Sequence, residues 1–138
     1  MRRIRLTALA GAQLLAARLL LRRAGLVRAL RYLDSRHWLA GDPSPLDERL
    51  AAVRRASRLV PNSACLAQTV AMLGMLSSGD ASPELVIGCH LQDGTWGAHA
   101  WLEWEGARVE PVVGADQVEL ARASRVSGWE LVPAIPIS

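Results

Sequence analysis

A cysteine at a predicted helix start and a histidine in a predicted strand could together form a nucleophilic pair. Cys65 follows Pro61-Asn62-Ser63-Ala64 and lies in the first turn of a predicted helix. The unpaired backbone N–H groups and the dipole at such a position stabilise a thiolate and can hold an oxyanion. His99 lies in mid-strand between two alanines, which leave room around its ring. A cysteine beside such a histidine is the arrangement that nucleophilic catalysis at sulfur needs.

A third group must orient the imidazole of His99. The turn at Glu105-Gly106 is expected to bring the next strand beside His99. Glu110 lies on that next strand, so Glu110 is the natural candidate. Glu103, which shares a strand face with His99, and Asp116 are the alternatives.

The same residues also fit a protein without catalytic activity. A free cysteine at the start of a core helix is often a small buried apolar residue. His99 and Glu110 would then be ordinary strand residues, and the chain a non-catalytic binding module. Fast alkylation of Cys65 near neutral pH would separate the two hypotheses.

Metal and cofactor sites are not predicted. Cys65, Cys89, His90 and His99 could supply four zinc ligands, but their spacing matches no paired-ligand pattern. The chain also lacks a glycine-rich phosphate loop and a Gly-x-Ser-x-Gly elbow.

The elements that must position these residues are helices first and strands afterwards, which predicts an α+β domain with an antiparallel meander. Helical periodicity covers the first half of the chain, with a break near Gly25. An Asp-Gly turn signal at Gln92-Asp93-Gly94-Thr95 separates two of the strands. The expected helices are 4–33, 45–60 and, after a cap at Asn62 or Ser63, a third that ends at Leu76. The expected strands are 85–91, 96–104, 107–110 and 129–134.

Length and composition fit one compact domain. The chain has 138 residues, of which 51% are hydrophobic and 21% charged, so disorder and collagen are excluded. Two cysteines do not make a disulfide scaffold. We expect residues 1–45 to form an Arg- and Leu-rich helical segment with a loop, and residues 46–138 to form the core.

The charge of +3 is unevenly distributed. Residues 1–60 carry 13 arginines and 4 acidic residues, whereas residues 61–138 carry 3 arginines and 9 acidic residues. The arginines lack interleaved aromatic residues and no zinc-finger or helix-turn-helix pattern is present, so nucleic acid is not an expected partner. The asymmetry suggests that the two halves face different partners or each other, and the alternative is a solvated, arginine-rich helix face.

The N-terminus resembles a signal peptide, but arginines at 18, 22 and 23 follow the apolar stretch 6–17 too soon. The apolar run is also short and interrupted for a membrane span. The spacing of its apolar residues predicts an amphipathic helix that packs on the domain. Docking on a partner or on an anionic membrane surface is the alternative.

Four segments in this order resemble the transglutaminase-like leader peptidases of lasso peptide biosynthesis, in their stand-alone form. They are Pro61-Asn62-Ser63-Ala64-Cys65-Leu66, Leu85-Val86-Ile87-Gly88, Ala98-His99-Ala100-Trp101-Leu102-Glu103 and the Glu105-Gly106 that follows. The N-terminal helix is also similar to that family's N-terminal region. The resemblance is strongest from Pro61 to Glu110 and departs from the family at Cys89, where an aliphatic residue is usual.

The resemblance implies a papain-like or transglutaminase-like core with a Cys-His-acid triad, matched here by Cys65, His99 and Glu110. The implied activity is proteolytic removal of the leader from a ribosomally made precursor. The implied partners are the precursor, a small leader-recognition protein and an ATP-dependent macrolactam cyclase, and the expected location is the bacterial cytoplasm. Acyl transfer to an amine, on the same triad, is the alternative chemistry.

Overall fold

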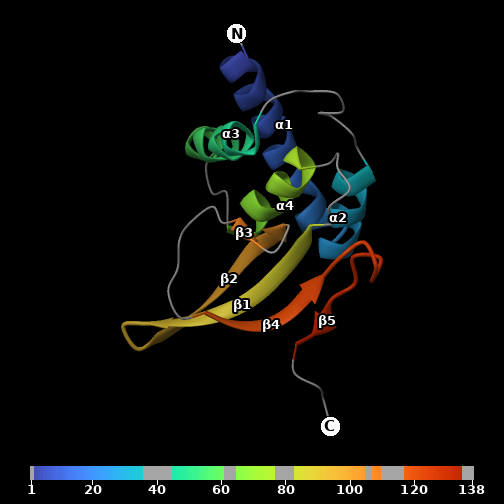
Figure 1. The fold of residues 1–138 in the computed structure, drawn as a ribbon, viewed down its shortest axis with the longest axis vertical. Helices are drawn as coiled ribbons and strands as arrows, with labels where there is room; N and C mark the ends of the chain where they lie inside the picture. Colours follow the sequence, from blue (N-terminus) through green and yellow to red (C-terminus); the bar gives the residue numbers. More distant parts are fainter. Residues whose placement is uncertain are drawn as a thin grey trace.

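The computed structural model describes residues 2–35, 45–60, 65–76, 83–104, 107–109 and 117–134. Four helices lie on one side of an antiparallel sheet, and the far end of the β1–β2 hairpin extends beyond them (Figure 1). This arrangement, helices first and sheet second, confirms the α+β prediction.

The helices are α1 (Arg2–Arg23), α2 (Leu26–Ser35), α3 (Leu46–Leu59) and α4 (Cys65–Met75). Gly25 separates α1 from α2 with a φ of +89°, a conformation that favours glycine. The predicted helix break at this residue is therefore confirmed.

Helix α1 packs through one face against α3 and α4. That face buries Leu6, Ala10, Leu14 and Ala17 completely or almost so. Its stretch Arg3–Arg23 is nevertheless long and apolar enough to cross a membrane by length and composition, with a mean hydropathy of 1.5. The predicted exclusion of a span by length therefore does not hold, although one face of the helix is packed against α3 and α4.

The sheet has the strand order β3-β2-β1-β4-β5. The β1–β2 turn has positive φ at Asp93 (52°) and Gly94 (77°), as an Asp-Gly hairpin turn requires. The strands are β1 (Glu84–Gln92), β2 (Thr95–Trp104), β3 (Ala107–Val109), β4 (Gln117–Ala123) and β5 (Val132–Pro133).

The last strands differ from the prediction. The simple meander is wrong, because β4 crosses over to pair with β1 on the side away from β2. Strand β4 was not predicted, and the predicted strand 129–134 is reduced to Val132–Pro133. Trp129 instead lies in a turn with a φ of +66°. A shift of register between Ile87 and Gly88 breaks the alternation along β4 that would have marked it as a strand.

The two faces of the sheet have different surroundings. One face, here called the helix face, carries Leu85, Leu102 and Ala123, which belong to the same buried cluster as α4. The other, the outer face, carries Val86 with its cross-strand partners Trp101 and Arg122. Helix α4 is central to the core because its residues from 69 to 75 are all buried.

Asp34 at the end of α2 holds the turn that joins β4 to β5. Its carboxylate accepts hydrogen bonds from Arg125 Nε at 2.9 Å and from Trp129 Nε1 at 3.1 Å. Arg31, one helical turn earlier, donates from Nε to Gly128 O at 2.8 Å. These contacts join segments more than 90 residues apart and fix the C-terminal turn on the helical layer.

Candidate active site

Helix α4 begins at Cys65, and this residue meets β2. Cys65 Sγ lies 3.2 Å from His99 Nδ1 and 3.2 Å from the carbonyl oxygen of Ala100. The apolar, almost fully buried body of α4 fixes the helix in the core, so its first residue is held against the strand. The structure thus brings together the two residues that the sequence predicted as a nucleophilic pair, here called the Cys65–His99 pair.

Thr69 stabilises this junction between α4 and β2. Its role was not predicted from the sequence. Its hydroxyl lies 2.9 Å from Cys65 O and 3.1 Å from Ala100 O, and the side chain is fully buried. One hydroxyl hydrogen is shared between these two acceptors. A threonine one turn after the cysteine, directly before the apolar run 70–76, is the sequence signal that could have identified it.

The junction forms along the edge of β2. Strand carbonyls lie roughly in the plane of a sheet, so donors that reach Ala100 O approach along the strand edge. In the described part of the chain, β3 pairs with β2 at Leu102, Glu103 and Trp104, beyond this point. The start of α4 therefore lies beside the part of the β2 edge that is not paired with β3 among the described residues. The ring of His99 reaches the thiol at this place.

An indole lies next to the imidazole of His99. The rings of His99 and Trp101 stack with centroids 6.0 Å apart and an interplanar angle of 29°. Trp101 also packs over Gly88, where an added Cβ would lie 2.8 Å from the indole and 2.6 Å from Val118 O. Gly88 is the cross-strand partner of His99, so glycine, imidazole and indole lie together on the outer face.

Of the three candidates for the third residue of the triad, the structure describes Glu103. Glu110 and Asp116 lie outside the described residues. Glu103 lies on the outer face near Arg122, with its carboxylate oxygens 3.4 Å from a guanidinium nitrogen. Because Nδ1 of His99 faces the thiol, the third residue of a triad would have to accept a hydrogen bond from Nε2.

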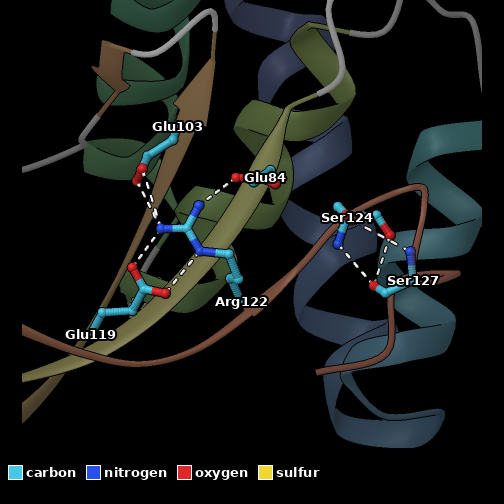
Figure 2. A network of polar contacts seen from close by, with 6 residues as sticks. All are labelled: Glu84, Glu103, Glu119, Arg122, Ser124 and Ser127. Atoms are coloured by element: carbon cyan, nitrogen blue, oxygen red, sulfur yellow. Dashed lines mark hydrogen bonds and ion pairs between the residues drawn. The ribbon is translucent and has the colours of Figure 1, made fainter. Parts of the chain in front are cut away.

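Arg122 is the centre of a four-residue cluster on the outer face, with the helices behind the sheet in Figure 2. Its guanidinium contacts Glu84, Glu103 and Glu119, and Nε donates to Glu119 Oε2 at 2.8 Å. The hydrogen bond to Arg122 and its charge hold the pKa of Glu119 below its ordinary value, against the opposing effect of burial. The hydrogen bond to Glu119 and the surrounding carboxylates raise the pKa of Arg122, also against burial.

The register shift in β4 is what makes this cluster possible. Glu119 pairs with Gly88 and Arg122 pairs with Val86, so both point to the outer face. Residues three apart in a regular strand would point to opposite faces. The shift therefore gives Arg122 a carboxylate from its own strand, a relationship that no alternation pattern predicts.

Metal binding finds no further support in this site. Among the described residues no group of three or more His, Cys, Asp and Glu side chains could hold a metal ion. Cys89 is a free, half-buried thiol whose cross-strand partners are Ala98 and Val118. The Cys65–His99 pair is thus the chemical feature of the site, and it can perform nucleophilic attack from sulfur with the imidazole as the proton carrier.

The first residue of a helix is a cysteine that contacts a strand histidine, and this arrangement is used in covalent catalysis by enzymes that form thioester intermediates. A family model of the transglutaminase-like superfamily matches residues 11–125, from α1 to the turn after β4. The chain belongs to this superfamily, which includes cysteine peptidases and transglutaminases. Comparison with curated proteins and with solved structures gives no match.

Proposed function

We propose that the protein is a cysteine peptidase that removes the leader from a ribosomally synthesised lasso peptide precursor. The observation that carries the peptidase chemistry is the distance of 3.2 Å between Cys65 Sγ and His99 Nδ1, at the first residue of α4. The substrate class is supported by the resemblance from Pro61 to Glu110. The proposed location is the bacterial cytoplasm.

The mechanism starts with a proton transfer within the Cys65–His99 pair. His99 Nδ1 takes the thiol proton, and the sulfur attacks the carbonyl at the end of the leader. The backbone N–H groups at the start of α4 stabilise the oxyanion. The imidazolium then protonates the departing amine of the core peptide, and a thioester of the leader remains. Water, deprotonated by the imidazole, hydrolyses this thioester and restores the thiol.

The partners follow from the same proposal. A small leader-recognition protein presents the precursor, and an ATP-dependent macrolactam cyclase receives the freed core peptide. The surface proposed for this docking is the outward side of α1, where Ile4, Leu15 and Leu19 are each more than half exposed. Because the opposite side of α1 belongs to the core, Leu15→Glu with Leu19→Glu tests docking without removing the helix.

The decisive experiment incubates a lasso precursor peptide and a leader-recognition protein with this protein, and identifies the products by mass spectrometry. We expect a leader that ends in a free carboxylate and a core peptide with a free amine. The matched control is Cys65→Ser, which keeps the size of the side chain. Intact precursor with the wild-type protein would contradict the proposal.

The same products distinguish acyl transfer, which uses the same pair with an amine in place of water. Addition of an excess of a small primary amine tests this alternative. The amine would attack the thioester in place of water and release the thiol, so a leader that ends in the corresponding amide would identify an acyltransferase.

A further inference from the structure

A small apolar pocket opens beside the Cys65 thiol. Its volume is about 300 Å³, at the lower end of the range for ligand sites. Besides Cys65 and His99, its lining residues are Leu66, Ile87, Ala98 and Ala100. The described lining residues include no arginine, aspartate or glutamate, so a charged group would lose its hydration beside them without gaining an ion-pair partner.

Three elements build the walls of this pocket. Leu66 comes from α4, Ile87 from β1, and Ala98 and Ala100 from β2. Ile87 and Ala100 are cross-strand partners and therefore share the helix face, and Ala98 lies two residues along the same strand. The small side chains of the two alanines keep the pocket open, because a longer side chain at either position would occupy it.

We propose that this pocket binds one apolar side chain of the substrate, next to the carbonyl that Cys65 attacks. This proposal rests on the proposed function, in which Cys65 is the nucleophile, and adds the chemical class of the residue that is recognised. Each methylene transferred from water into such a pocket strengthens binding about fourfold. The pocket therefore selects for acyl groups with an uncharged side chain of several carbons within reach of the sulfur.

The test uses three iodoacetamides that differ in the group on nitrogen: methyl, hexyl and carboxypentyl. The alkylation rate of Cys65 is measured for each, with the adduct located by mass spectrometry so that Cys89 is counted separately. Each rate is divided by the rate of the same reagent with glutathione. We expect the hexyl reagent to react with Cys65 at least about tenfold faster than the methyl reagent. The carboxypentyl reagent, which has a similar length and a charge, is expected to show no such gain.

A matched pair of variants assigns the preference to this pocket. Ala98→Leu places a larger side chain in the pocket at an exposed strand position, so it should reduce the hexyl-to-methyl ratio to about one. The ratio is formed within each variant, so a change in the reactivity of the thiol itself affects both reagents and cancels from it. Ala12→Leu makes the same change at an exposed position of α1 and should leave the ratio unaltered.

The ratio and the absolute rate answer different questions. A hexyl-to-methyl ratio near one in the wild-type protein would overturn the pocket proposal, whatever the absolute rate. A ratio of about ten that persists in Ala98→Leu would also overturn it. Slow labelling of Cys65 by all three reagents would instead count against the activated thiol of the proposed function, and the ratio would still decide on the pocket.

Discussion

The indole of Trp101 lies over Gly88 so closely that a single added carbon at residue 88 would be 2.8 Å from its ring. Real Cβ atoms do not approach other atoms so closely. Because Trp101 also stacks on His99, Gly88 supports the position of the imidazole through this indole. The support is steric: Gly88 gives the indole a flat surface on the neighbouring strand.

Gly88→Ala should therefore displace Trp101. We expect the free energy of unfolding to fall by about 1–3 kcal/mol, as for other overpacked sites, and the alkylation rate of Cys65 to fall as well. Urea denaturation and the methyl iodoacetamide rate measure the two effects. Gly11→Ala is the control, because a Cβ there would meet Ala56 at an ordinary 3.9 Å. In a helix this control should be neutral or stabilising. An unchanged alkylation rate of Cys65 in Gly88→Ala would contradict the proposal that Gly88 supports His99 through Trp101.

The proposed catalytic role of the Cys65–His99 pair predicts that its substitution abolishes cleavage and leaves the fold intact. Cys65→Ala should reduce precursor cleavage by at least about 10³-fold, with a circular dichroism spectrum like that of the wild type. His99→Ala should slow alkylation of Cys65 at pH 6 by about tenfold or more, because the base that accepts the thiol proton is removed. A Cys65→Ala protein that still cleaves the precursor would disprove the mechanism.

The acid of the triad is tested by three substitutions compared in one assay. Glu110→Ala should lower kcat for precursor cleavage, but less than substitution of Cys65 or His99, because the third residue orients rather than reacts. Glu103→Gln should lower stability with little effect on kcat, since its carboxylate lies beside Arg122. If Asp116→Ala lowers kcat more than Glu110→Ala does, Asp116 is the orienting residue.

The Arg122 cluster predicts a specific loss of stability in acid. The pKa of Glu119 is lower in the folded protein than its ordinary value of 4.5, so its ionised form favours folding. This contribution is complete above about pH 5 and is lost as the pH falls through the lowered folded-state pKa. Between pH 6 and pH 3 the wild-type protein should lose more unfolding free energy than Glu119→Gln. Unfolding free energies are measured by urea denaturation at pH 6 and pH 3. Equal losses in the wild-type protein and in Glu119→Gln would contradict this assignment.

The contacts of Asp34 predict a large effect from a small substitution. Asp34→Asn removes the charge that accepts hydrogen bonds from Arg125 and from the buried Trp129. We expect a loss of about 1–3 kcal/mol in unfolding free energy. Glu130→Gln at the neighbouring exposed ion pair with Arg31, 3.9 Å apart, should change stability by less than about 0.5 kcal/mol. Thermal unfolding of both variants makes the comparison.

The sequence was informative where a local rule decides the conformation. Gly25 ends α1 and Asp93-Gly94 closes the β1–β2 hairpin, because both turns need positive φ. Cys65 and His99 were predicted as a pair from their places in a helix and a strand, and the structure brings them into contact.

The features that escaped prediction depend on contacts between distant segments. Strand β4 carries a register shift, so its apolar residues do not alternate as a strand pattern requires. Thr69 gains its role from Ala100 O, 31 residues later, and Gly88 from the ring of Trp101. No spacing rule within one element encodes these contacts.

The junction between α4 and β2 has a consequence for the order of events during synthesis. Both contacts of the Cys65 thiol at this junction are made with residues 34 or 35 positions later in the chain. During translation the cysteine is therefore added to the chain 34 residues before the histidine that contacts it. The thiol gains its partner only when β2 docks onto α4, so a chain that ends before His99 lacks the Cys65–His99 pair. Alkylation of Cys65 on stalled nascent chains would register the moment when this docking occurs.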